Sequence, residues 1–308
     1  MNLSEKIIAI LRCPRSGQPL RLERGALVAA DGLHRYRIED GIPLFAEEFC
    51  SAEARTQQQH YDVIAESYTA SLDYAHTQEY TAYLDAALTD AIGHRLGLTA
   101  ELCCGRGEAI RLLGDRMDGA VGVDISVRML SSAVHELSGP GIALVQGDAT
   151  RLPLATDAFD SVVMLGGIHH VADRLALFQE VRRILKPGGW FYFREPVSDF
   201  FLWRWIRSVI YRLSPQLDHA TERPLLHEET VPVLVQAGLK PEMWRTVGLF
   251  GFCLFMNSDV LLFNRPFRHV PGIRKLVRGS AWLDDRLTRL PAFARAGLIV
   301  VGAARKPA

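Results

Sequence analysis

Three acidic side chains stand where predicted strands end, and acids in such places can bind a ribose. Glu101 ends one apolar stretch and precedes a glycine-containing turn at 105–107, while Asp124 and Asp148 stand at the ends of the next two stretches. Glycines in a turn tolerate positive φ angles and let a ligand approach the backbone, and an acid at the next strand end can accept hydrogen bonds from a ribose diol. We therefore predict a cofactor site where these strand ends meet.

The segments that carry these acids alternate between strand and helix patterns. Strands are predicted at 98–102, 120–124, 142–146, 161–165 and 189–195, with helices at 106–117, 126–137 and 172–185. A further helix at 226–237 and strands at 240–249 and 298–302 follow. Alternation of this kind indicates parallel βαβ units. We predict an α/β fold that is Rossmann-like, with a seven-stranded, mostly parallel sheet and helices on both faces.

Two further regions flank this pattern. Residues 1–48 predict a small N-terminal α+β module, and residues 49–308 form the second predicted domain. Within the second domain, segments at about 198–225 and 250–292 are expected to cover a substrate. The latter is a helical, aromatic-rich insertion between the last two strands.

Composition limits the function classes. The 308 residues carry 35 Lys+Arg and 35 Asp+Glu, so no global attraction to nucleic acid follows from the net charge of zero. Five cysteines without a disulfide-like framework indicate a reducing compartment. The N-terminus does not resemble a signal peptide, and no apolar run reaches the roughly 18 residues of a membrane span. We expect a cytoplasmic protein.

The nature of the predicted cofactor follows from the residues around the turn. A dinucleotide site favours a third glycine, and Ile110 stands at that position. A pyrophosphate would also be repelled by the nearby Glu101. S-adenosylmethionine has no phosphate and carries a cationic sulfonium and an ammonium group, so an acid-lined pocket suits it better.

The motifs as a whole resemble those of class I S-adenosylmethionine-dependent methyltransferases, of the type 11 or UbiE-like kind. Residues 101–107 look like the family's first motif, 121–126 with Met129 like its ribose motif, 147–149 like its adenine motif, and 185–189 like its post-helix motif. The match is good over about 60–195. It implies a methyltransferase that binds S-adenosyl-L-methionine and releases S-adenosyl-L-homocysteine.

The resemblance also assigns roles to residues. Glu101 and the backbone of Gly105 and Gly107 would hold the methionine part, and Asp124 the ribose hydroxyls. Ile125 and Met129 would flank the adenine, and Asp148 would bond to its amine. Tyr68 would close over the cofactor, although it could equally be a core residue. The complete predicted cofactor set is Tyr68, Glu101, Cys103, Gly105, Gly107, Asp124, Ile125, Met129, Asp148, Ala149 and Leu165.

Cys103 departs from the family pattern, which usually has glycine there. A side chain at this position would narrow the cofactor site or change the turn. We expect Cys103 to be a small buried apolar residue without a catalytic role.

Methyl transfer needs an aligned nucleophile and, for many acceptors, a base that removes a proton. His169 and His170 follow the fourth predicted strand and Glu195 ends the fifth, so these three are the catalytic candidates. The alternative is that the histidine pair only begins a helix. Adjacent side chains on a helix diverge, and we expect no metal.

The N-terminal module resembles the small, zinc-ribbon-like Trm112 domain, through the segments at 13–16 and 36–44. Zinc members of that group carry two cysteine pairs. Here Ser16 occupies the second position and no later pair exists, so we predict no zinc and a structural or dimerisation role. The sequence leaves the oligomeric state open, and a dimer is compatible with it.

Residues 200–213 predict a basic amphipathic helix. Such a helix can lie on a membrane interface or cap an apolar pocket, and the alternative is an ordinary core helix. Together with the aromatic insertion, it favours a bulky hydrophobic acceptor and is compatible with peripheral membrane contact.

The sequence thus predicts methyl transfer to a small, apolar metabolite of lipid, isoprenoid, quinone or polyketide type, in small-molecule biosynthesis. An RNA methyltransferase is one alternative, which the balanced charge and missing zinc ligands disfavour. A non-catalytic protein that binds S-adenosylmethionine is the other.

Overall fold

The computed structural model describes residues 3–46, 50–59, 62, 73–134, 136–137, 139, 141–205, 223–256 and 262–308. Tyr68 and residues 206–213 of the predicted amphipathic helix lie outside these ranges. Within them, residues 52–59 and 201–205 are helical. None of the described helices is long and apolar enough to cross a membrane.

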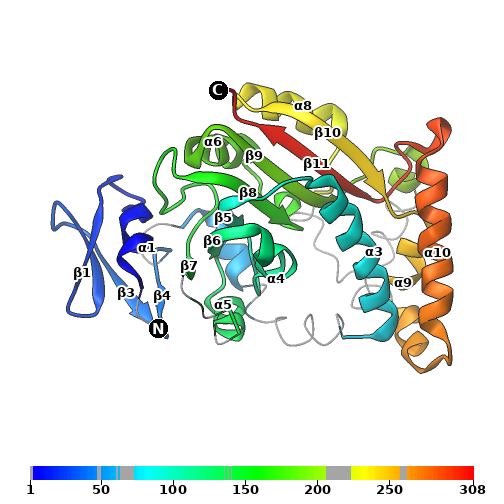
Figure 1. The fold of residues 1–308 in the computed structure, drawn as a ribbon, viewed down its shortest axis with the longest axis horizontal. Coiled ribbons are helices and arrows are strands. Elements are labelled where there is room, and N and C mark those ends of the chain that lie inside the picture. Colours follow the sequence, from blue (N-terminus) through cyan, green and yellow to red (C-terminus); the bar gives the residue numbers. More distant parts are fainter. Residues whose placement is uncertain are drawn as a thin grey trace.

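A seven-stranded sheet forms the centre of the molecule (Figure 1). Its strand order is β10-β11-β9-β8-β5-β6-β7. The bounds are β5 (Gly97–Leu102), β6 (Met117–Asp124), β7 (Ile142–Gln146), β8 (Phe159–Leu165), β9 (Leu185–Pro196), β10 (Lys240–Val247) and β11 (Ile299–Arg305). Only β11 runs antiparallel to its neighbours, so the predicted mostly parallel Rossmann-like sheet is confirmed.

The strand order reverses direction at β5, which pairs with β6 on one side and β8 on the other. The chain runs outward from β5 through β6 to β7 and then crosses back to β8. Ligands of open α/β sheets bind outside the carboxyl ends of the strands at such a reversal. The topology therefore directs the search for a site to the ends of β5, β6 and β8.

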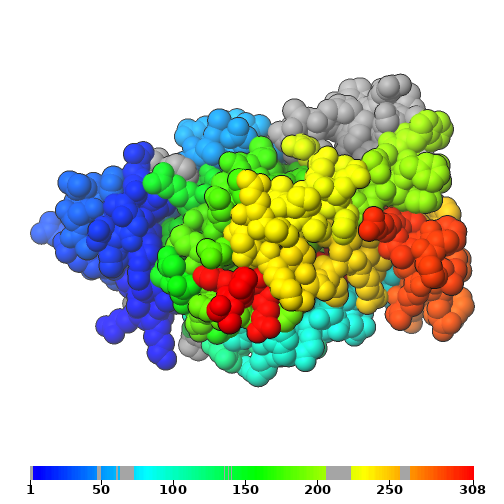
Figure 2. Space-filling model, turned by 90° about the horizontal axis from the view of Figure 1, so that it is seen from above, coloured from blue at the N-terminus to red at the C-terminus, as the bar shows by residue number. Residues whose placement is uncertain are grey.

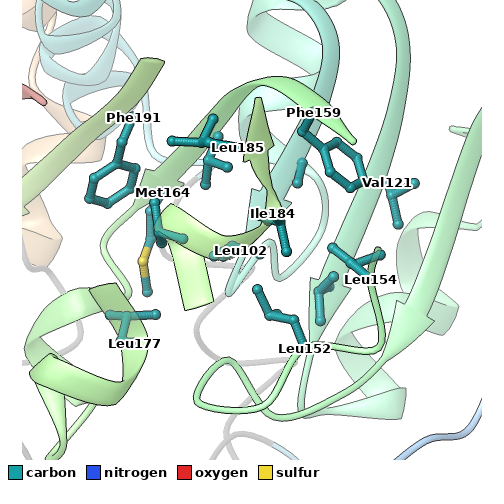
Figure 3. Close-up of a cluster of buried hydrophobic side chains, with 14 of the residues drawn as sticks. Leu102, Val121, Leu152, Leu154, Phe159, Met164, Leu177, Ile184, Leu185 and Phe191 are labelled. Atoms are coloured by element: carbon teal, nitrogen blue, oxygen red, sulfur yellow. The ribbon is translucent and has the colours of Figure 1, made fainter. Parts of the chain in front are cut away.

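Helices cover both faces of the sheet because its side chains alternate in direction. On β9, Phe191 and Phe193 join a core with Phe178 of α6 (Arg174–Ile184), while Tyr192 joins a second core with Tyr80 of α3 (Ala75–Ala91). Figure 3 shows part of the first core. Helices α4 (Glu108–Leu113) and α5 (Val127–Ala133) contribute to the third cluster, and α8 (His227–Gln236) packs on α6 and β10.

Some predicted element ends are wrong. The first helix was expected at 106–117, but α4 ends at Leu113 and a 3-10 turn leads into β6 at Met117. The segment at 185–189 was expected to end a helix before a strand at 189, yet β9 begins at Leu185. Lys186 forms an ion pair with Asp160 at 2.7 Å, and Gly188 provides the left-handed conformation at φ 77°. Tertiary pairing with β8 thus extends the strand into the stop signal.

The N-terminal residues form a four-stranded antiparallel sheet beside α1 (Glu5–Ile10). Its strands are β1 (Leu20–Glu23), β2 (Ala26–Ala29), β3 (Arg35–Glu39) and β4 (Ile42–Pro43). Leu44 bridges to Gln146 of β7, and the N–H of Phe45 donates to the Gln146 carbonyl at 3.1 Å. The module therefore covers the β7 edge of the large sheet and shares a core with it. The boundary at residue 48 stays a prediction.

The insertion between the last two strands forms the opposite end of the molecule (Figure 1). It contains α9 (Phe250–Phe255), α10 (Ile273–Thr288) and the 3-10 segments η3 (Leu262–His269) and η4 (Pro291–Phe293). Helix α10 packs on α3 and α9.

A buried carboxylate holds this end together. Asp284 of α10 is 1% exposed, and its Oδ2 accepts hydrogen bonds from Tyr80 Oη at 2.5 Å and from the N–H groups of Leu249 and Gly251 at 2.9 Å. One acceptor on α10 thus binds donors from two other segments, at Tyr80 and at Leu249–Gly251.

Replacing Asp284 by Ala should destabilise the chain by about 3 kcal/mol, because three buried donors lose their acceptor. Urea unfolding followed by circular dichroism measures the change. The neighbouring Asp285 forms half-exposed ion pairs with Arg245 and Arg289, so Asp285→Ala should cost no more than about 1 kcal/mol. Equal losses in the two variants would contradict this role of Asp284.

Candidate active site

A cavity of about 610 Å³ opens at the carboxyl ends of β5, β6, β7 and β8. Its size falls within the range of small-molecule sites. Of the predicted residues, those in its wall are Cys103, Gly105, Asp124, Ile125, Met129, Asp148, Ala149, Leu165 and His170. Glu101, Gly107, His169 and Glu195 are not in the wall. The structure thus brings most of the predicted cofactor residues to one place.

Asp124 links the turn after β5 to the start of α5. Its Oδ2 accepts a hydrogen bond from the Gly105 N–H at 2.8 Å, and its Oδ1 accepts one from the Ser126 N–H at 2.8 Å. Burial raises the pKa of Asp124, and these N–H groups oppose that shift. The carboxylate has more lone pairs than its backbone donors use, so it can also accept a hydrogen bond from a ribose in the cavity.

Glu101, which was predicted to hold the methionine part of the cofactor, lies outside the cavity wall, and that role stays a prediction. Glu101 is 1% exposed, and its two oxygens accept the N–H groups of Ala109 at 2.7 Å and Ile110 at 2.9 Å. Desolvation by burial raises the pKa of Glu101 to about 8, against the effect of these two donors. Its carboxylate therefore lies behind the turn and satisfies the N-terminus of α4, which fixes the backbone that faces the cavity.

Gly107 also acts from behind the wall. Its φ is 74°, and a Cβ there would lie 2.2 Å from Leu137 Cδ1. Gly105, at φ 50°, lines the cavity, and a Cβ there would lie 3.3 Å from Met129 Cε. Both positions need the left-handed conformation that glycine adopts at little cost.

Asp148 is engaged by two loops. Its Oδ1 accepts hydrogen bonds from the N–H of Thr150 at 2.8 Å and from its hydroxyl at 2.6 Å, and its Oδ2 accepts the Ser51 N–H at 2.9 Å. This last bond attaches the helical residues 52–59, which contribute Ala54 and Gln57 to the cavity wall. The predicted bond from an adenine amine would add to this set.

Cys103 has a close partner that the sequence did not indicate. Cys103 adopts φ 48°. A Cβ atom added at Gly167 would lie only 2.5 Å from the Cβ atom of Cys103. Burial raises the pKa of the Cys103 thiol, and the charges of Asp124, Glu195 and Asp148 act in the same direction. A raised pKa disfavours the nucleophilic thiolate form of Cys103, and the expected lack of a catalytic role stays a prediction. It couples the turn after β5 to the loop after β8.

Glu195 organises the loop after β8. This carboxylate is completely buried, and its Oε1 accepts the N–H groups of Gly167 at 2.7 Å and Ile168 at 2.9 Å. Its Oε2 lies 2.8 Å from His169 Nδ1. With Nδ1–H donating to the carboxylate, the Nε2 atom of His169 keeps its lone pair available for a proton. The His169 side chain is 13% exposed.

The two histidine rings do not diverge as expected. They lie in the 3-10 turn η2 (Ile168–His170), and their centroids are 3.8 Å apart. The prediction assumed α-helical geometry, which this turn does not have. In the ranges that the structure describes, no three His, Cys, Asp or Glu residues form a group that could hold a metal ion. Cys13 Sγ instead lies 3.0 Å from Tyr36 Oη and accepts the Ser16 N–H at 3.3 Å.

Glu108 is one of three acids in the cavity wall that the sequence analysis missed, the others being Glu53 and Asp173. Glu108 is the first residue of α4 and lies in the wall with Cys103 and Leu165. Burial raises the pKa of Glu108, Arg194 opposes this shift, and Asp85 adds to it. Arg194 itself pairs with Asp85. In the sequence, the position of Glu108 directly after Gly107 could have indicated that it lies beside the cofactor turn.

Comparison with known proteins agrees with this geometry. Residues 100–193 match the family model described as a methyltransferase domain. A 2-phytyl-1,4-naphtoquinone methyltransferase of Nostoc punctiforme is 28% identical over 60% of this chain and 77% of its own length. A demethylmenaquinone methyltransferase of Beutenbergia cavernae is 35% identical over 37% of this chain and 45% of its own length, so the chain spans less than half of that relative.

The solved structure of the [4+2]-cyclase SpnF aligns with a TM-score of 0.57, 19% identity, and coverage of 87% of this chain and 99% of that one. At this identity the likeness shows the fold alone. The fold and the cavity agree with the likeness of residues 100–193 to a methyltransferase domain. The likeness of the N-terminal module to Trm112 stays a prediction.

The contact between Cys103 and Gly167 predicts a compensated pair of substitutions. Gly167→Ala should lower the stability by about 1–3 kcal/mol, because the added methyl group overlaps Cys103. Cys103→Gly in the same chain should restore much of this loss and also relieve the left-handed strain. Thermal unfolding of the two single variants and the double variant measures the coupling. A double variant no more stable than Gly167→Ala would refute the contact.

Glu108→Gln should weaken S-adenosylmethionine binding by about tenfold and S-adenosylhomocysteine binding less, because only the former carries the sulfonium charge. Since the pKa of Glu108 is raised, its charged form accumulates only above the usual carboxyl range. Binding to the wild type should therefore strengthen as the pH rises through that raised pKa, and the variant should lack this dependence.

Isothermal titration calorimetry with both ligands measures these affinities. Glu53→Gln is the matched control, because Glu53 also lines the cavity but is exposed, and solvent screens its charge. Equal effects on both ligands together with no pH dependence would refute the assigned role of Glu108.

Proposed function

We propose that this chain transfers the methyl group of S-adenosylmethionine to a small, hydrophobic, quinone-like acceptor. The observation that carries the proposal is one cavity that joins the glycine turn and Asp124 to the loop held by Glu195. Cofactor and acceptor must lie side by side for an in-line displacement, and this cavity adjoins both loops.

The residues present fit the cofactor. Asp124 offers lone pairs for the ribose, Gly105 allows close approach, and Glu108 provides negative charge near the turn. The cofactor would supply an electrophilic methyl group on a sulfonium. Orientation and deprotonation of the acceptor would be carried out by residues of the acceptor site, for which we propose no metal.

His169 is the proposed base. Its Nδ1 faces the buried Glu195, which leaves Nε2 for a proton. His169 lies outside the cavity wall, with its ring centre 3.8 Å from that of the wall residue His170, so in this proposal the acceptor hydroxyl or acidic C–H group reaches past the His170 ring to Nε2. Glu195 acts through His169 and through the loop backbone, as a positioning residue. His170, which lines the cavity, would contact the acceptor.

The acceptor class is supported from two sides. Leu165, Val171 and Ala172 give the cavity apolar wall next to the histidine loop. The relatives named above carry naphthoquinone and menaquinone names, and quinones of this kind combine a polar ring with apolar substituents. A cytoplasmic location, peripheral contact with a membrane through residues 200–213 and a dimer-compatible N-terminal module are further parts of this proposal.

His169→Gln should lower kcat for a naphthoquinol acceptor by about 10²–10⁴-fold, with little change in cofactor affinity. Glu195→Gln should lower kcat and shift the pH–rate profile, since the carboxylate fixes the His169 tautomer. Methylation measured with labelled S-adenosylmethionine, across pH 5–9, tests both. His94→Gln, on an exposed side chain before β5, is the control. An unchanged kcat in His169→Gln would exclude it as the base.

A further inference from the structure

Helix α10 has an outer face that no other described element covers. Its inner face is formed by Ile273, Val277, Ala281, Asp284 and Thr288, which are all buried. The side chains of Leu276 and Trp282 are each 60% exposed and that of Leu283 is 46% exposed. Large apolar side chains at this exposure, gathered on one helix, indicate an interaction surface.

The charges on this helix are divided between two sides. Arg274 and Arg278 lie toward α3, where they pair with Glu79. Helical periodicity places Lys275 and Arg286 on the outer side with Trp282, and the Arg286 guanidinium lies 5.1 Å from the Trp282 ring centre. The outer face of α10 therefore carries positive charge and apolar surface without an acidic side chain.

The same imbalance extends over the whole segment. Residues 262–295 contain eight Lys and Arg residues but only Asp284 and Asp285 as acids, although the chain has no net charge. Asp284 is buried and Asp285 is paired. Arg274 and Arg278 pair with Glu79 and Arg289 pairs with Asp285, whereas the side chains of Lys275 and Arg286 are exposed on the outer face.

A second apolar group lies beside this end of the molecule. Phe201 and Trp205 of the helical residues 201–205 are 72% and 66% exposed. Trp203 of the same helix donates a hydrogen bond to the Ala296 carbonyl just after η4. Figure 2 shows these residues, in lime green, next to the orange and red atoms of α10 and η4. The two groups belong to one end of the structure.

We propose that the outer face of α10, with Lys275, Trp282 and Arg286 at its centre, docks the chain on an anionic lipid bilayer. Lysine and arginine side chains would lie among the headgroups, and Trp282, Leu276 and Leu283 would enter the interfacial region. Trp is favoured at this depth, because its ring is apolar and its N–H is polar. A nucleic acid would use the charge but not the exposed leucines.

This inference rests in part on the proposed function, since a quinone-like acceptor with an apolar tail would reside in a bilayer. Docking would bring the chain to its acceptor. The binding itself requires neither cofactor nor acceptor, so the two ideas can fail separately.

The test is co-sedimentation of the full chain with phosphatidylcholine vesicles, with and without phosphatidylserine. The wild type should pellet only with phosphatidylserine, and added salt should weaken the binding. The double variant Lys275→Glu/Arg286→Glu should bind at least about thirtyfold more weakly. Trp282→Ala should keep the preference for phosphatidylserine but bind more weakly.

The matched control is Lys6→Glu/Lys240→Glu, which changes the net charge equally at exposed sites elsewhere. It should bind as the wild type does. The proposal would be overturned if the two double variants lost vesicle affinity equally. It would also be overturned if vesicle binding did not depend on phosphatidylserine, or if the wild type did not bind vesicles. Retention on single-stranded RNA in place of vesicles would also overturn it.

Methylation of a water-soluble acceptor distinguishes this proposal from the proposed function. The Lys275→Glu/Arg286→Glu variant should retain that activity, because none of its changes touches the cavity. Loss of vesicle binding with full activity supports docking, whereas absent activity in the wild type would count against the function alone.

Discussion

A carboxylate at the end of a strand that accepts backbone N–H groups from a loop or helix start at the same edge of the sheet is the interaction on which the site depends. Glu101 holds the start of α4 in this way, Asp124 holds the turn after β5, and Glu195 holds the loop after β8. Loops at the edge of a sheet carry N–H groups without a partner in secondary structure, and burying them unpaired would cost free energy. The carboxylates remove that cost and give the cavity a fixed wall.

The same interaction separates structural acids from those that can meet a ligand. Glu101 and Glu195 have their oxygens turned toward the backbone and lie outside the cavity wall. Asp124 and Asp148 serve both purposes, because a carboxylate has more lone pairs than these loops use. Glu108 lines the cavity and has a raised pKa, so a bound cation would favour its charged form.

The two ends of the molecule differ in how they complete the sheet. At the β7 edge, the N-terminal module adds Leu44 and Phe45 alongside Gln146 and closes an edge that would otherwise present unpaired backbone groups. At the other end, Asp284 ties α10 to α3 and to the start of α9 and leaves the outer face of α10 exposed. The β7 edge of the sheet is thus covered by the N-terminal module, whereas α10 exposes an apolar and positively charged surface to the solvent.

The sequence by itself determined the alternation of strands and helices, the sheet class, and the collection of Gly105, Asp124 and Asp148 at one edge, because periodicity and strand-end positions are local properties. It could not determine which way each carboxylate points. The direction of Glu101 and the closeness of Cys103 to Gly167 depend on contacts between segments distant in the chain. The place of Glu108 in the wall was missed for the same reason, since it exists only once α4 is packed against β8 and β6. The tertiary structure decided these points because backbone donors and close contacts are set by packing, which no single segment specifies.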